Sequence, residues 1–384
     1  MDFSWSKRQT ELYQKALAIA ENELFEEASS EREPQEFPKQ KWERCSQFGL
    51  MGLSLPPSYG GLGLDALTSA YVFEAFGKGC SDRGLLFSAA AHLLATAMPI
   101  AEYGQPDLQK AILPQLATGQ WIGANAITEA EAGSDIIAIQ TTAQEQDGYY
   151  YLDGQKSYVT NGPIADVIVT YAVTNPQAGY LGISGFVVEK DRPGIILGEA
   201  FEKMGLHSAQ AGWVRFENCR VPKSNMLGKP GEGATIFKRS MQWERAVLFA
   251  FYIGTLDRQL ETTVAFARKR KQFGKALIKH QAVAHRLADM KLRLEQARLL
   301  LYKACWALDQ DEGAVLDVAL SKLAVSQAAI QSSLDAVHLH GAEGYKADGE
   351  IEAMLRDAIP STIFSGTSEM QRDLIANYLE MGIA

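Results

Sequence analysis

Residues 149–159 read Tyr149-Tyr150-Tyr151-Leu152-Asp153-Gly154-Gln155-Lys156-Ser157-Tyr158-Val159. The aromatic and β-branched residues in this stretch favour extended strands. The dipeptide Asp153-Gly154 supports the positive φ angles of a tight turn. The stretch therefore predicts a β-hairpin whose turn is formed by these two residues.

Further strands are predicted in the same region of the chain. They lie at 166–173 (DVIVTYAV), 185–188 (GFVV) and 213–216 (WVRF). No segment with a helical period separates them. We therefore expect a small antiparallel β-domain over residues 121–232, and not a series of parallel βαβ units.

The sequence before the strands is helical in character. Segments 8–29 and 66–100 are rich in Ala, Leu and Glu and contain few turn residues. A loop is predicted at 55–63, where prolines and glycines cluster.

The sequence after the strands is also helical. Apolar residues there alternate spacings of four and three, as in a helical bundle. On the first long helix they are Val283, Leu287, Met290, Leu294, Ala297, Leu301, Ala304 and Leu308. On the next they are Leu316, Leu320, Leu323, Ile330, Leu334 and Val337. Gly341 is expected to end the second helix.

These patterns predict an α+β fold with three consecutive parts. Residues 1–120 form an N-terminal α-helical domain, residues 121–232 a middle antiparallel β-domain, and residues 233–384 a C-terminal four-helix bundle.

Composition excludes several classes of protein. The 384 residues are 47% hydrophobic, as in globular proteins, and their net charge of −9 argues against a nucleic-acid-binding surface. The cysteines Cys45, Cys80, Cys219 and Cys305 are far apart, which is typical of free thiols in a reducing compartment. The N-terminus lacks an apolar signal region, and no apolar run approaches the roughly 20 residues of a membrane span. We expect a cytoplasmic protein.

Common cofactor and catalytic motifs are absent. The glycine-rich stretches 59–65 and 228–233 lack the G-x-G-x-x-G spacing of a nicotinamide site, and the sequence has no P-loop and no G-x-S-x-G elbow. The six histidines include no H-E-x-x-H, so we expect no metal site.

Several other segments are informative because of their order. They are 127–135 (ITEAEAGSD), 156–162 (KSYVTNG), 203–205 (KMG), 216–222 (FENCRVP), 270–274 (RKQFG) with Gln281, 341–345 (GAEGY), 356–358 (RDA) and 364–369 (FSGTSE). As an ordered set over nearly the whole chain, they resemble the motifs of the acyl-CoA dehydrogenase family. That resemblance implies the same α, β, α order and the FAD-dependent oxidation of an acyl thioester.

The resemblance also implies which residues bind FAD. A reduced flavin needs hydrogen-bond donors at its pyrimidine edge and near N5. Thr128 and Thr160 stand at those positions, and Tyr158 replaces a Trp that flanks the ring. The remaining positions implied to contact the cofactor are Ser134, Arg270, Phe273, Gln281, His338, Gly341, Gly366, Thr367 and Glu369. Arg270, Phe273 and Gln281 are expected to reach the cofactor of a neighbouring subunit.

The catalytic base shows the most informative departure from the family. Most members carry a Glu where this chain has Ser365, and a serine cannot remove an α-proton at neutral pH. A minority, including isovaleryl-CoA dehydrogenase, place the Glu on the first bundle helix, which corresponds to Glu244 here. A carboxylate in this apolar stretch is either paired with Arg245 or functional, and we assign it as the base. Ser365 and Arg245 are assigned to the substrate pocket.

His92 has two interpretations. By family position its helix walls the acyl pocket, where a cationic imidazole beside reduced flavin would favour O₂ as acceptor. Alternatively, its ring bonds a neighbouring carbonyl within the helical core. His207 and His338 are rival candidates for the cationic role.

The resemblance extends to the prolyl-acyl-carrier-protein oxidases and dehydrogenases of secondary metabolism, of the anatoxin-a pathway type. It implies that prolyl carried as an acyl-carrier-protein thioester is oxidised to a pyrroline, with O₂ or an electron-transfer flavoprotein as acceptor. It also implies a homotetramer. Two alternatives stay open: a short branched-chain acyl-CoA dehydrogenase of isovaleryl type, and a non-catalytic member that binds a thioester.

Overall fold

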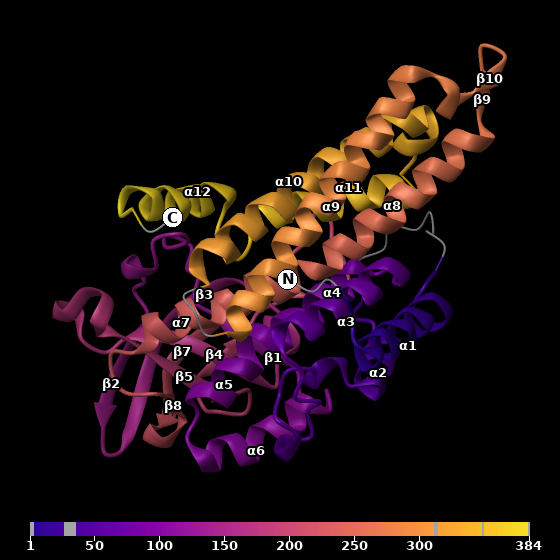
Figure 1. Ribbon diagram of the computed structural model, residues 1–384. Helices are drawn as coiled ribbons and strands as arrows, with labels where there is room; N and C mark the ends of the chain where they lie inside the picture. Colours follow the sequence, from indigo (N-terminus) through magenta and orange to yellow (C-terminus); the bar gives the residue numbers. More distant parts are fainter. Residues whose placement is uncertain (1–3, 27–35, 311–313, 348, 383–384) are drawn as a thin grey trace.

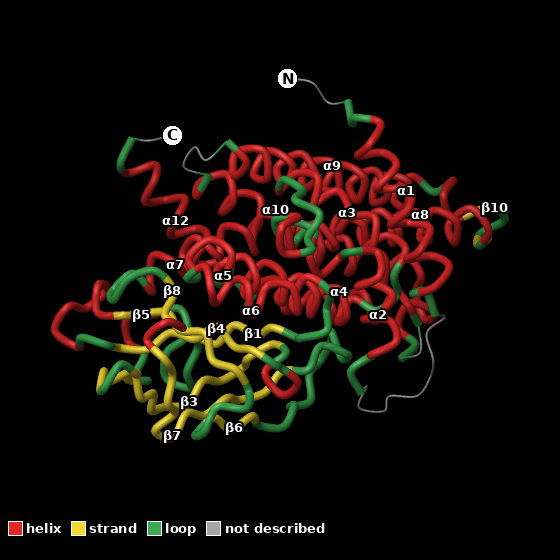
Figure 2. Tube along the Cα trace, turned by 90° about the horizontal axis from the view of Figure 1, so that it is seen from below, coloured by secondary structure: helices red, strands yellow, loops and turns green. Residues whose placement is uncertain are grey.

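The computed structural model describes residues 4–26, 36–310, 314–347 and 349–382. Helices form the first and last parts of the chain and strands the middle, which confirms the predicted fold class. Figure 1 shows the long C-terminal helices running diagonally above the N-terminal ones. In Figure 2 the strands lie together as a layer below the helices. The limits at 120/121 and 232/233 stay predictions.

The N-terminal part is a cluster of helices. They are α1 (Lys7–Glu23), α2 (Lys39–Phe48), α3 (Ala66–Gly79), α4 (Arg83–Ala90), the π-helical turn η3 (Ala91–Ala97), α5 (Met98–Tyr103) and α6 (Pro106–Ala117). α1 confirms most of the predicted helix 8–29, of which residues 27–29 lie outside the described ranges. Short 3₁₀ turns, at Leu50–Gly52 and Pro57–Tyr59, accompany the predicted loop.

The expectation that no apolar run approaches the length of a membrane span was wrong for this part of the chain. The continuous helical stretch Arg83–Tyr103 is 21 residues long and apolar enough to cross a membrane, by length and composition alone. Its most apolar window is 94% buried inside the protein. Burial of that extent is typical of a helix in a protein core, and here neighbouring helices and the strand β1 (Gly123–Ala126) pack against it.

The middle part is a sheet with the order β6-β7-β3-β2-β4-β5-β8, in which β1 also pairs with β4. Its strands are β1 (Gly123–Ala126), β2 (Thr142–Gln146), β3 (Tyr149–Thr160), β4 (Val167–Val173), β5 (Ile183–Glu189), β6 (Ile195–Leu197), β7 (Ala211–Pro222) and β8 (Met226–Leu227). The pairings are antiparallel except for β1 with β4 and β2 with β4. The predicted strands 166–173, 185–188 and 213–216 are confirmed as parts of β4, β5 and β7.

The hairpin turn lies earlier than predicted. Residues Asp147 and Gly148 have φ of 50° and 80° and join β2 to β3 as a two-residue turn. β3 runs straight through Asp153-Gly154, where its register against β7 shifts at a bulge. The Asp153 carboxylate accepts a hydrogen bond from the Asn218 backbone N–H at 2.6 Å. Long pairing with β7 therefore keeps the second Asp-Gly pair within a strand.

The C-terminal part is a helical bundle with a small hairpin at one end. Its elements are α7 (Gly233–Trp243), the π-helical turn η8 (Glu244–Leu248), α8 (Ala250–Lys269), β9 (Lys271–Gln272), β10 (Lys275–Ala276), α9 (Gln281–Asp309), α10 (Val315–His340), α11 (Glu350–Ala358) and α12 (Ser368–Glu380). The predicted seam on α9 is confirmed from Leu287 to Leu308 by burial. α10 ends at His340, and Gly341 follows with φ of 61°.

The predicted seam on α10 is only half buried. The fully buried face of that helix carries mostly small and polar residues, among them Ala319, Ser321, Ser326 and Ala329. Small side chains let neighbouring helices approach closely, so this face takes the interior position. The leucines at 316, 320, 323 and 334 are left partly accessible.

Two glycines set the distance between α3 and α8. A Cβ atom on Gly77 would lie 2.0 Å from the Phe251 carbonyl oxygen, and one on Gly254 would lie 2.0 Å from the Glu74 carbonyl oxygen. Both contacts are to backbone atoms, which cannot move aside without separating the helices. Because Glu244 precedes α8 in the same run of helix, this crossing also fixes the position of the candidate base.

We predict that Gly254→Ala lowers the free energy of unfolding by about 3 kcal/mol, because overpacking must push α3 and α8 apart. Urea unfolding followed by circular dichroism measures this difference. Ala265→Ser, at an exposed position of the same helix, is the control and should leave the midpoint unchanged. Equal stability of both variants would contradict the close-packing argument.

Candidate active site

Glu244 lies at the start of a π-helical turn, directly after α7, and is 8% exposed. Burial raises the pKa of its carboxyl group above the ordinary value. A hydrogen bond donated by the Ser365 hydroxyl and the nearby Arg245 guanidinium oppose that rise. The structure therefore combines a buried carboxylate with one hydrogen-bond donor and one nearby positive charge, both of which favour its ionised form, and this is a suitable environment for a general base.

Arg245 is coupled to Glu244 through a third residue. Its Nε donates to the Ser365 carbonyl oxygen at 2.6 Å, while the Ser365 hydroxyl donates to the Glu244 carboxylate. The adjacent residues Glu244 and Arg245 thus bind the hydroxyl and the backbone carbonyl of the same serine. The structure brings together Glu244, Arg245 and Ser365, three of the four residues that the sequence assigned to the base and the substrate pocket, whereas the fourth, His92, has other partners.

The predicted flavin-contacting residues of the β-domain lie on strand β3 (Tyr158 and Thr160) and in the loop between β1 and β2 (Thr128 and Ser134). The Ser157 N–H donates to the Thr128 carbonyl oxygen at 2.8 Å, which places the 127–135 motif beside the 156–162 motif. Tyr158 is 67% exposed and meets Phe201 edge-on. Thr128 and Thr160 are partly exposed, and Ser134 is fully exposed. These side chains can therefore contact a bound group.

An ion pair behind these residues was missed by the sequence analysis. The Lys156 ammonium is fully buried and donates to Glu129 Oε1 at 2.7 Å. Glu129 also accepts hydrogen bonds from the Thr141 N–H and hydroxyl and from the Gln140 N–H. Burial lowers the pKa of Lys156 to about 8, which leaves it protonated at neutral pH. The available signal was that a Lys and a Glu stand in two motifs of the same ordered set.

Asn161 is a second residue that the sequence analysis left without a role. Its amide donates to the Ser88 carbonyl at 3.0 Å and to the Gly123 carbonyl at 3.1 Å. These bonds join the end of β3 to α4 and to β1. Asn161 has φ of 62°, a conformation that Asn tolerates better than most residues.

His92 belongs to the core and not to a pocket wall. Its Nε2 contacts the Leu116 carbonyl oxygen at 3.0 Å, and its Nδ1 accepts from the Gly123 N–H at 2.9 Å. Because Nδ1 accepts the Gly123 N–H, it cannot carry a proton of its own without losing that hydrogen bond. Burial also disfavours the charged ring and lowers the pKa of His92 to about 4. The structure favours the carbonyl-bonded interpretation over a cationic imidazole.

His207 is also a poor candidate for the cationic role. It is exposed, and its Nε2 lies 2.6 Å from an Arg356 nitrogen. Partial burial and the charge of Arg356 lower its pKa. Within the described ranges, no group of three or more His, Cys, Asp or Glu residues is placed to hold a metal ion.

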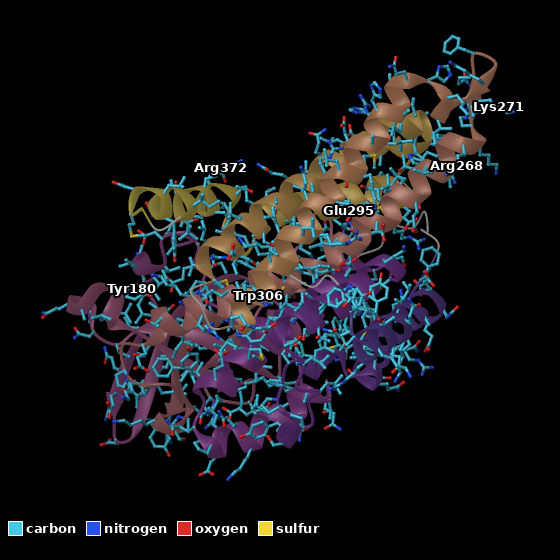
Figure 3. All side chains as sticks on the ribbon, in the orientation of Figure 1. Tyr180, Arg268, Lys271, Glu295, Trp306 and Arg372 are labelled. Carbon is cyan, nitrogen blue, oxygen red and sulfur yellow. The ribbon has the colours of Figure 1, made fainter. Side chains whose placement is uncertain are left out.

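Five of the predicted cofactor residues lie at the far end of the bundle. They are Arg270, Phe273, Gln281, His338 and Gly341, all exposed at the junction of α8, α9 and α10. Phe273 is 95% exposed on the β9–β10 hairpin. Figure 3 labels Arg268 and Lys271, which flank Arg270, at this tip, far from Tyr180 in the strand-bearing half. The structure does not bring these residues to Thr128 and Thr160 within one chain.

Thr367 and Glu369 line a cavity of about 760 Å³ between α9, α10 and the start of α12. Thr367 caps α12 by accepting the Met370 N–H at 3.3 Å. Arg293 and Arg372 lie on the cavity wall, and the buried Ser368 hydroxyl has no partner among the described residues. An anionic or strongly polar ligand could use these groups.

The chain matches three models of one family. They are the N-terminal domain of acyl-CoA dehydrogenase at residues 6–120, its middle domain at 124–219 and its C-terminal domain at 231–379. The chain is 52% identical over 346 residues to an L-prolyl-(peptidyl-carrier protein) dehydrogenase of Pseudomonas fluorescens, with 90% of this chain and 91% of the relative covered.

Two solved structures are similar over nearly their whole length. The prolyl acyl carrier protein oxidase AnaB is 42% identical, with a TM-score of 0.95 and coverage of 98% of this chain and 100% of that one. A structure described as PigA with FAD and proline is 41% identical, with a TM-score of 0.96 and coverage of 99% and 100%.

The buried His92 predicts a loss of stability in acid. Its pKa of about 4 lies below the ordinary 6.5, so the unfolded chain binds the proton more readily between these values. The free energy of unfolding therefore falls as the pH drops from 6.5 towards 4. The loss amounts to about 2 kcal/mol at pH 5. Urea unfolding at pH 7 and pH 5 measures this, and His92→Gln should show a smaller difference. Parallel pH dependences would contradict the assignment.

Proposed function

This chain belongs to the acyl-CoA dehydrogenase family, and we propose that it oxidises a carrier-protein-bound prolyl thioester to the pyrroline with FAD as its cofactor. The proposal rests chiefly on the buried Glu244 carboxylate. It accepts a hydrogen bond from Ser365, which stands at the position where most of the family has its catalytic Glu. The relatives named for prolyl-carrier-protein oxidation support the substrate class.

The residues present fit FAD. Tyr158 and Thr160 on β3, and Thr128 in the adjacent loop after β1, offer hydroxyl and aromatic groups suited to a flavin ring. The cavity beside Thr367 and Glu369 offers room and an unpartnered buried hydroxyl for the adenosine half. When bound, FAD supplies the hydride acceptor.

Glu244 is assigned to remove the α-proton of the prolyl group. The proton passes to its carboxylate, and the hydride that leaves the prolyl ring would be taken up by bound FAD, so that both electrons of the oxidation are accounted for. An α-proton is weakly acidic, so the base must be ionised and shielded from water. The Ser365 backbone N–H is assigned to the thioester carbonyl, whose developing negative charge it would stabilise.

A second copy of the chain is proposed to complete the cofactor site. Arg270, Phe273 and Gln281 project from the tip of the bundle, where the Phe273 ring is 95% exposed and available for contact with a partner. Exposed apolar residues also recur every seven positions on α9, at Leu292, Leu299 and Trp306. These features support a homo-oligomer, which we propose to be the tetramer.

The carrier protein and the electron acceptor complete the proposed reaction. The acceptor is O₂ in an oxidase or an electron-transfer flavoprotein in a dehydrogenase. The four cysteines, all within the described residues, are free and buried, which supports the proposed cytoplasmic location.

We predict that prolyl-carrier protein bleaches the bound flavin under anaerobic conditions and that isovaleryl-CoA does not. Absorbance spectroscopy of the purified protein measures this. Bleaching by isovaleryl-CoA alone, or a colourless protein, would overturn the proposal. Readmission of air then separates the acceptors, since only an oxidase restores the oxidised spectrum rapidly.

Glu244→Gln should retain FAD and lower the bleaching rate by about 10²–10⁴-fold, because an amide cannot accept the α-proton. Rapid-mixing spectroscopy with prolyl-carrier protein measures the rate. Glu232→Gln, at an exposed carboxylate just before α7, is the matched control and should bleach normally. Normal bleaching by Glu244→Gln would remove Glu244 as the base.

A further inference from the structure

Ser365 contacts both the candidate base and the arginine next to it. Its hydroxyl donates to Glu244 Oε1, and its carbonyl oxygen accepts from Arg245 Nε at 2.6 Å. The residue has φ of 56°, in the left-handed region that non-glycine residues rarely adopt. Such a backbone persists only where the surroundings hold it, and it is frequent at functional sites.

The surroundings hold this loop from both sides. Arg245 binds the Ser365 carbonyl, and the buried Gln371 amide donates to the Gly366 carbonyl at 3.1 Å. Gly366 itself has φ of 84°. The loop 365–366 is therefore fixed between the π-helical turn after α7 and the first turn of α12.

We propose that Ser365 is a positioning residue whose hydroxyl holds Glu244 in one orientation and keeps its carboxylate ionised for proton abstraction. This inference rests on the proposed function only in assigning Glu244 as the base. A hydroxyl is suited to the task because it both donates and accepts. It donates to the carboxylate before proton transfer and can accept from the carboxylic acid afterwards, so the contact survives the step.

The charges around Glu244 explain why a donor is needed. Burial raises the pKa of Glu244. Arg245, on the same helical run, opposes the rise, and Tyr171 on β4 also interacts with Glu244. Around them, Tyr103 on α5 interacts with Tyr171, and Glu369 on α12 interacts with Lys322 on α10. The Lys322 ammonium interacts with Arg245 and lies over the Phe249 ring. Among the described residues, Ser365 alone donates a side-chain hydrogen bond to the carboxylate, and Arg245 acts on it through its charge and donates to the Ser365 carbonyl instead.

Ser365→Ala and Ser365→Gly test the proposal in the FAD-loaded protein. Both remove the hydroxyl, and glycine also adopts the left-handed backbone without strain. A hydrogen bond to a carboxylate is worth about one to two pKa units, so the acid limb of the kcat profile should move to higher pH by about that much. On the acid limb of the profile kcat should fall by about tenfold at a given pH, with KM nearly unchanged.

The pKa of Glu244 is measured independently of turnover by infrared titration of its carboxylate band, identified with Glu244→Gln. It should rise in both Ser365 variants. Ser361→Ala, which removes a buried hydroxyl bonded to the Ala358 carbonyl, is the control and should leave the band and the profile unchanged.

An unchanged Glu244 pKa in Ser365→Gly overturns the proposal. This holds even if Ser365→Ala fails to fold, because Ser365→Gly carries the test alone. If the wild-type protein does not bleach with prolyl-carrier protein, the proposed function fails, while the infrared titration still decides the role of Ser365.

Discussion

The three parts of the chain meet at the carboxylate of Asp357. One oxygen accepts the Leu206 N–H at 2.6 Å, from the segment that leads into β7, and the other accepts from Arg83 at the start of α4 at 3.3 Å. Its backbone carbonyl accepts the Tyr252 hydroxyl of α8 at 2.8 Å. Removing a buried carboxylate with several donors would leave each donor unsatisfied, which is far costlier than losing one surface bond. The relative placement of β-domain, N-terminal helices and bundle therefore depends on this residue.

Two helical runs, Arg83–Tyr103 and the run from α7 into α8, each contain a turn of π geometry, and these two turns contact each other. The turn Ala91–Ala97 carries His92, and the turn Glu244–Leu248 carries the candidate base. A π turn inserts an extra residue into the helix and so changes which side chains face a given neighbour; such turns are frequent at functional sites. One of these turns serves packing, since His92 joins Leu116 to Gly123. The other presents Glu244 to Ser365. A π-helical turn therefore has a packing role in one place and a proposed catalytic role in the other. Because His92 and Glu244 are both buried, burial alone does not distinguish the two roles.

The order of the three parts and the bundle seam on α9 could be predicted from sequence because both depend on local periodicity. The placement of the hairpin turn could not. Two Asp-Gly pairs compete for it, and the decision rests on how far β3 pairs with β7. His92 was undecided for the same reason, because its partners are 24 and 31 residues away. The pair of Lys156 with Glu129 and the support of Ser365 by Arg245 likewise depend on contacts that spacing in the sequence does not contain. The grouping of Glu244, Arg245 and Ser365 was accessible only through the family resemblance.

The separation of the predicted cofactor residues is itself an argument about assembly. Thr128 and Tyr158 lie in the β-domain, whereas Arg270 and Phe273 lie at the opposite end of a bundle whose helix α9 alone has 29 residues. An α-helix rises about 1.5 Å per residue, so that helix spans roughly 40 Å, well beyond the length of one dinucleotide. Motifs that belong to one cofactor in the family therefore cannot serve the same bound molecule within one chain. Either the tip residues have lost that role, or a second copy brings its own tip to this β-domain. The exposed Phe273 and the half-buried leucines of α10 favour the second arrangement, because both are apolar surfaces that a second copy would cover.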